Sequence, residues 1–138
     1  MKRILILLPI ISIVFCLTAC LPDVFEGRNT YFVNNATTDT IQVVFELMPD
    51  KIFGSEKAIK SIIVLPARDT CLQSYTIGTM WTPSSVFKSI VFLSTAKDTL
   101  YKMDIINDDE WVLTDSAPDY GSPVSFYNWT YSFGVDSK

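Results

Sequence analysis

The chain has 138 residues, of which 49% are hydrophobic, with a formal net charge of -4 and no histidine. This length accommodates one domain and a targeting segment rather than two full domains. Lys2 and Arg3 are two of the 11 basic residues, so the rest of the chain carries nine basic against 15 acidic residues. That balance argues against nucleic-acid binding, which needs a basic surface. Without histidine the chain lacks the commonest general base and metal ligand, so we expect no enzyme, no cofactor and no metal site.

The amino terminus is typical of an export signal. Lys2 and Arg3 precede an apolar run over 4–17 that is shorter than the roughly 20 residues of a membrane-spanning helix. Pro9 within the run also argues against a long spanning helix. We therefore predict a signal peptide over residues 1–19.

The end of this segment, Leu17-Thr18-Ala19-Cys20, resembles the lipobox of bacterial lipoproteins. The resemblance implies cleavage before Cys20, diacylation of its thiol and acylation of the new amine, which would make membrane lipid the partner of Cys20. Three acyl chains suffice for stable anchoring, whereas one does not. The alternatives are an uncleaved helix and a plain secretory signal followed by a chance cysteine.

The predicted organisation is a signal peptide (1–19), an acylated tether (20–29) and a β-domain (30–135). Leu21 directly after the cysteine favours the outer membrane, by resemblance to Gram-negative lipoproteins. Asp23 and Glu26 are a weak match to the acidic signal that sends some lipoproteins to the cell surface. Both the periplasmic face and the cell surface stay open.

Runs of β-branched and aromatic residues, broken by turn residues, predict that the mature chain forms short strands separated by turns. Residues 40–48 alternate apolar and polar side chains, as a strand with one buried face does. The predicted strands cover 31–34, 40–48, 60–65, 70–77, 86–95, 99–106 and 123–133. This spacing predicts an all-β fold, an antiparallel immunoglobulin-like β-sandwich of about seven strands.

Local patterns also predict how some strands pair. The short turn after 31–34 predicts a hairpin with 40–48, and a second turn predicts a hairpin of 86–95 with 99–106. The run 60–65 is apolar on both faces, which predicts a central strand, with 70–77 pairing back across the turn at 66–69. A phase change at 127–128 predicts a β-bulge. Residues 107–120 are expected to be irregular, with one helical turn near 108–112.

The order of short motifs in the mature chain resembles a family, the small lipoproteins of anaerobic gut Gram-negative bacteria. The motifs are Tyr31-Phe32-Val33-Asn34-Asn35, Thr40-Ile41-Gln42-Val43, Pro49-Asp50, Asp98-Thr99-Leu100 and Tyr127-Asn128-Trp129-Thr130-Tyr131. The resemblance implies class and location, and it carries no activity.

Cysteine and acidic residues are the first candidates for chemistry. Cys16 leaves with the signal and Cys20 is acylated, so Cys71 has no partner for a disulfide and is expected to be a buried small residue. An acidic group lies at Asp104, Asp108, Asp109, Glu110, Asp115 and Asp119. A solvated turn explains this group best. A calcium site would need alternating ligand spacing, and a carboxylate pair for glycoside hydrolysis would need a cleft.

Tryptophan side chains are the second candidates. Trp129 alternates with Tyr131 and Phe133, which predicts core packing. Trp81 and Trp111 lie in segments expected to be loops, so they are the predicted contacts for a glycan or peptide ligand. The alternative is that both cap an open end of the sandwich.

A modification site is the third candidate. Asp115-Ser116-Ala117 resembles the Asp-Ser/Thr-hydrophobic O-glycosylation signal of the same anaerobes, which makes Ser116 the predicted acceptor. Asp39-Thr40-Ile41 and Asp98-Thr99-Leu100 match the same pattern, although Asp and Thr are also ordinary residues at a turn-to-strand boundary.

Together these features favour a lipid-anchored protein of the outer membrane or cell surface that acts as a non-catalytic interaction or accessory module, with an unidentified protein or glycan partner. The alternative is a glycan- or peptide-binding lipoprotein that uses its loop aromatics. A carboxylate-based hydrolase is the third possibility.

Overall fold

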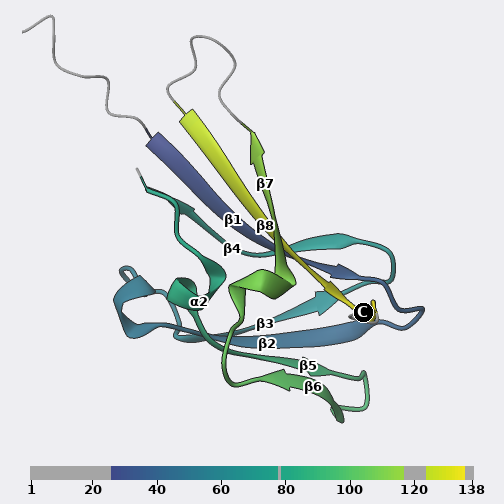
Figure 1. Cartoon of the computed structure of the whole chain (residues 1–138). Coiled ribbons are helices and arrows are strands. Elements are labelled where there is room, and N and C mark those ends of the chain that lie inside the picture. The colour runs from purple at the N-terminus through teal and green to yellow at the C-terminus, as the bar shows by residue number, and fades with distance from the viewer. Residues whose placement is uncertain (1–25, 78, 117–123, 136–138) are drawn as a thin grey trace, which may run out of the picture.

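The computed structural model describes residues 26–77, 79–116 and 124–135, which form two four-stranded sheets packed face to face (Figure 1). The strands are β1 (Glu26–Asn35), β2 (Ile41–Leu47), β3 (Ile59–Val64), β4 (Asp69–Thr76), β5 (Phe87–Leu93), β6 (Thr99–Met103), β7 (Trp111–Ser116) and β8 (Val124–Phe133). The predicted all-β antiparallel sandwich is confirmed, with eight strands in place of about seven. Because β1 begins at Glu26, residues 26–29, which were predicted to be part of a tether, lie in the sandwich.

The first sheet has the strand order β4-β1-β8-β7 and the second has the order β3-β2-β5-β6. β1 and β8 run parallel over ten residue pairs, from Glu26↔Val124 to Asn35↔Phe133, whereas every other pairing is antiparallel. The register of β8 is continuous on both its neighbours, so the bulge predicted at 127–128 is wrong.

Two predicted pairings are wrong for the same reason. β1 and β2 lie in different sheets, and so do β3 and β4, so neither pair forms a hairpin. Residues 36–40 and 65–68 instead carry the chain from one sheet to the other. The hairpin of β5 and β6 is confirmed, with Ile90 opposite Met103.

The run at 60–65 was predicted to be a central strand and is an edge strand. β3 lies at the end of its sheet, where it forms a ladder with β2, and its Ile59 and Ile63 side chains are exposed. Strand pairing across a sheet is not a local property, so an apolar run alone does not reveal an edge.

Of the segment 107–120, which was expected to be irregular, residues 107–116 are described and are more ordered than predicted. It contains the 3₁₀ turn η2 (Asp108–Glu110), in agreement with the expected helical turn, and then β7, which pairs with β8 from Trp111↔Tyr131 to Ser116↔Phe126. The other short helices are η1 (Pro49–Lys51) and α2 (Pro83–Val86).

The core lies between the two sheets. β2 has the alternation that its sequence predicts, with Ile41, Val43, Phe45 and Leu47 buried on one face. Aromatic rings fill the rest: Phe92 stacks on Phe133 at 4.5 Å between ring centroids. Trp129 is buried here, as its alternation predicts.

Candidate functional site

The structure does not bring together the sequence-predicted residues Trp81 and Trp111, both of which it describes. Cys20 lies outside the described residues. Ser116 ends β7, where its backbone pairs with Phe126 of β8, and so it lies in a strand and not in the loop expected for it. Trp81 and Trp111 take very different positions.

Trp111 is a core residue, and its prediction as a ligand contact is wrong. It begins β7, is 5% exposed, and stacks on Phe87 at 5.9 Å between ring centroids. Pairing of β7 with β8 turns this side chain toward the opposite sheet, as it does for Trp129.

Trp81 lies between β4 and α2, as expected for a loop residue, but its ring is half-buried. Phe53 stacks on it at 6.4 Å with 11° between the planes, and Tyr75 meets it edge-on at 5.3 Å. The Lys51 ammonium lies 4.1 Å from the ring centroid, a cation–π contact. The ring of Trp81 is therefore engaged inside the protein.

Side chains of β1 hold this segment in place through hydrogen bonds with its backbone. The Asn29 Nδ2 donates to the Thr79 carbonyl at 2.9 Å, and the Trp81 N–H donates to Asn29 Oδ1 at 2.8 Å. The Tyr31 hydroxyl donates to the Trp81 carbonyl at 2.8 Å. Burial and the nearby oxygens of Tyr75 and Asp108 raise the pKa of Tyr31, so its phenol keeps the proton that it donates.

Phe53, Tyr75 and Trp81 form an aromatic group. Its exposed member is Phe53, which is 53% exposed. It borders an open hollow of about 510 Å³, which we call the aromatic hollow. One wall comes from the connection between β2 and β3, and the other comes from the edge strand β4. The lining residues are Phe53, Ser55, Glu56, Gln73, Ser74, Tyr75, Thr76 and Ile77.

A hydrogen-bonded triad joins the two walls. The Gln73 Nε2 donates to Glu56 Oε1 at 2.7 Å, and the Lys60 Nζ donates to Gln73 Oε1 at 2.7 Å. Lys60 also forms an ion pair with Glu56, and Gln73 is only 8% exposed. Each polar group of a buried amide needs such a partner, so this triad holds the loop against β4.

The ionisable groups of the hollow keep their ordinary charge states. Burial raises the pKa of Glu56, but hydrogen bonds from Lys60, Gln73 and the Phe53 N–H outweigh it, so the pKa is lowered overall. Burial and the charges of Glu56 and Asp50 raise the pKa of Tyr75 to about 12, and its hydroxyl donates to the Lys51 carbonyl at 2.8 Å. A paired carboxylate and a neutral phenol are suited to binding a ligand more than to transferring protons.

Asp119 of the acidic group lies outside the described residues, and the described members do not gather into a site. Asp108 accepts hydrogen bonds from the backbone N–H and the hydroxyl of Ser84, both at 2.7 Å, and so fixes the start of α2. Within 26–77, 79–116 and 124–135, no three potential metal-ligating side chains lie together. Cys71 is exposed on β4, which corrects the expected burial and follows from its place on the outer face of an edge strand.

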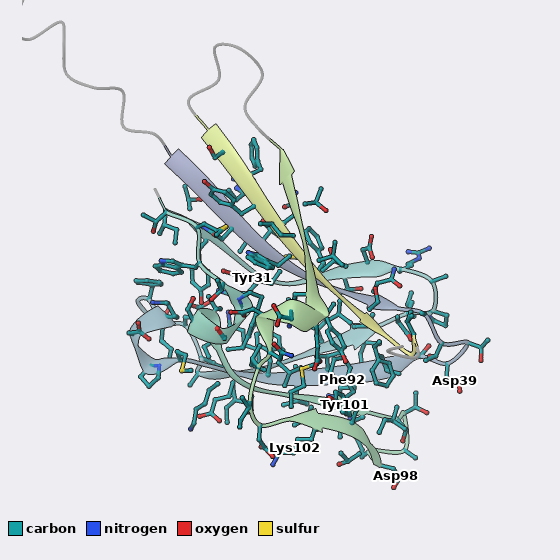
Figure 2. The ribbon with its side chains drawn as sticks, in the orientation of Figure 1. Tyr31, Asp39, Phe92, Asp98, Tyr101 and Lys102 are labelled. Atoms are coloured by element: carbon teal, nitrogen blue, oxygen red, sulfur yellow. The ribbon has the colours of Figure 1, made fainter. Side chains whose placement is uncertain are left out.

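A second hollow, of about 780 Å³, lies at another end of the sandwich. Figure 2 shows Asp39 and Asp98 toward this end, away from the start of β1. Its lining is mostly short hydroxyl side chains from 37–41 and 94–95, together with Leu100 and Phe133. One aromatic ring, that of Phe133, lines it, whereas the rings of Phe53 and Tyr75 both line the aromatic hollow.

Sequence reasoning missed Phe53, Glu56 and Gln73. The connection between the predicted strands 40–48 and 60–65 contains one aromatic residue, Phe53, next to Gly54, and that was the available signal. Gln73 comes close to Glu56 only because β4 crosses to the other sheet, so no local pattern joins them.

Comparison of the chain with known proteins found no matching family model, curated protein or solved structure. In the described ranges, none of the helices has the length and apolar character needed to cross a membrane.

Proposed function

We propose that this protein is a lipid-anchored lipoprotein of the outer membrane or cell surface, and that its sandwich is a non-catalytic interaction module. The observation that carries the anchor is the Leu17-Thr18-Ala19-Cys20 motif at the end of a short apolar run. Acylated Cys20 would then be the first residue of the mature chain.

The position of β1 supports a short tether. Only residues 21–25 separate Cys20 from Glu26, where β1 begins. An extended chain of this length spans at most about 18 Å. The sandwich would therefore stay next to the bilayer, with the start of β1 facing it.

The aromatic hollow supports interaction over catalysis. It combines an exposed ring with polar groups that hydrogen bonds hold in place, which is the usual composition of a small-ligand site. The hydrolase alternative has less support because both carboxylate oxygens of Asp108, at the centre of the acidic group, already accept hydrogen bonds from Ser84.

Labelled palmitate tests the anchor. Cells expressing the wild-type chain should incorporate the label into the protein and retain it in the membrane fraction, and Cys20→Ala should abolish both. Cys71→Ala is the matched control, because it removes the other cysteine of the mature chain and should leave labelling intact. Persistent labelling of Cys20→Ala, or a wild-type chain without label, would contradict the proposal.

A further inference from the structure

We infer that the aromatic hollow binds a neutral sugar ring of a glycan, with Phe53 as the stacking surface. The inference rests on the proposed function, since it names the ligand class of the proposed interaction module. It also moves the ligand contact away from Trp81 and Trp111, the residues that sequence analysis selects.

Phe53 is exposed and yet fixed. Tyr75 meets its ring edge-on at 5.8 Å with 72° between the planes, and Trp81 stacks on it at 6.4 Å. Trp81 is itself tied to β1 through Asn29. A ring already held in position loses little conformational freedom when a ligand stacks on it, which favours binding.

Hydrogen-bonding groups lie beside this ring. Glu56 Oε1 accepts from Lys60 and Gln73, whereas the contact that Oε2 makes within the described ranges is a long one, 3.5 Å from the Phe53 N–H. That oxygen is suited to accept a hydrogen bond from a ligand hydroxyl. Hydroxyl groups of Ser55, Ser74 and Thr76 line the same hollow and can both donate and accept.

The charges favour a neutral ligand. Lys60 and Glu56 are paired with each other, so neither offers an uncompensated charge to an anionic or cationic group. A sugar ring combines hydroxyl groups with an apolar C–H face, which matches a carboxylate oxygen beside an aromatic face. The volume of about 510 Å³ falls within the usual range for small-molecule sites.

The geometry is less suited to a peptide. An extended peptide would add to the free edge of β4, which borders the hollow. The ladder between β4 and β1 has a register shift at Tyr31/Phe32, and such irregularities protect an edge from strand addition. A peptide ligand is therefore an outcome of the test rather than the inference.

The test uses the full-length chain in detergent on an array of neutral oligosaccharides (xylo-, manno-, cello- and malto-series), followed by titration of the best ligand. Phe53→Ala should weaken binding about tenfold or more, the effect of losing one aromatic contact. Phe126→Ala is the matched control, since Phe126 is 37% exposed on β8 and does not border the hollow, and it should bind as the wild type does.

Glu56→Gln is a second variant that keeps the shape of the side chain and should weaken binding severalfold. No binding of any array glycan, or binding that Phe53→Ala leaves unchanged, would overturn the inference. So would a peptide-library ligand that depends on Phe53 in the absence of glycan binding. None of these outcomes affects palmitate labelling of Cys20, so failure of the sugar site is distinguishable from failure of the anchor.

Discussion

β1 carries a fully buried asparagine toward each end, and the two asparagines support different parts of the molecule. Asn29 and Asn35 lie six positions apart, both are 0% exposed, and both use their side-chain amides to hold a neighbouring loop. The Asn29 end leads into the aromatic group and the aromatic hollow. The Asn35 end closes the connections between the two sheets.

At the Asn35 end the hydrogen bonds are all internal. Its Nδ2 donates to the Asp39 carbonyl at 2.7 Å and to the Val64 carbonyl at 3.3 Å, and its Oδ1 accepts from the Thr37 hydroxyl at 2.7 Å. Its backbone carbonyl accepts from the Ala67 N–H at 2.8 Å. Asn35 thus holds both segments that cross between the sheets, 36–40 through its side chain and 65–68 through its backbone.

At the Asn29 end the hydrogen bonds support an exposed surface. Asn29 fixes Trp81, Trp81 stacks on Phe53, and Phe53 borders the aromatic hollow. The comparison shows that a buried asparagine can serve the fold at one end of a strand and position a candidate site at the other. Three substitutions test this difference.

Asn35→Ala should have the largest effect on stability. It removes several buried hydrogen bonds and leaves the Val64 carbonyl without its side-chain donor, so we expect a loss of about 2–4 kcal/mol in the free energy of unfolding. Urea denaturation measures it. Asn34→Ala is the matched control, because Asn34 makes one exposed hydrogen bond to Asp69 and should cost less than about 1 kcal/mol. Equal losses in the two variants would remove the structural role assigned to Asn35.

Asn29→Ala should cost less stability but affect the candidate site. Two hydrogen bonds are lost, at Thr79 and Trp81, for an expected loss of about 1–3 kcal/mol. The fluorescence of Trp81 should also change, and glycan binding should weaken along with it. The measurement compares Asn29→Ala with Asn35→Ala in Trp111→Phe/Trp129→Phe chains, where Trp81 is the only tryptophan. A spectral change in Asn35→Ala and none in Asn29→Ala would reverse the proposed division of roles.

The smallest effect concerns pH. Because the pKa of Glu56 is lowered in the folded chain, its contribution to stability is present above the unfolded value of 4.5 and is lost as the pH falls through the folded pKa. The group is partly solvated, so we expect the contribution to be below about 1 kcal/mol. Urea midpoints at pH 7, 5 and 3 should converge between wild type and Glu56→Gln at the lowest pH. A difference between the two urea midpoints that stays constant at all three pH values would show that the ionised Glu56 carboxylate is not the source of the stability difference.

Much of the fold was predictable because strand formation is local. β2 shows its buried face in the alternation of Ile41, Val43, Phe45 and Leu47, and the turn at 96–98 correctly indicates the hairpin of β5 and β6. A short polar turn, however, looks the same whether the chain returns within one sheet or crosses to the other. At 36–40 the side chain of Asn35 holds the segment that crosses to the other sheet. One of its hydrogen-bond partners, Val64, is 29 residues away in the sequence, so no local pattern reveals the crossing.

The sequence was a poorer guide to the site because side-chain exposure depends on distant pairing. Trp111 and Trp81 both follow polar, turn-rich segments, yet β8 turns Trp111 into the core and Phe53 partly covers Trp81. The run Trp111-Val112-Leu113-Thr114 contains aromatic and β-branched residues, which was a weak signal for β7, and the neighbouring acids masked it. The parallel pairing of β1 with β8, which joins the two ends of the domain, has no local signal.

We propose that acylated Cys20 tethers this sandwich to a membrane. The intact mass of the protein, purified from the membrane fraction of its native host, tests this proposal most directly. We predict a chain that begins at Cys20, lacks residues 1–19, and carries the added mass of three acyl chains and the glyceryl group. A further mass in hexose-sized steps would support glycosylation, with Ser116 as the expected acceptor. A mass equal to residues 1–138, or an unmodified chain that begins elsewhere, would contradict the account.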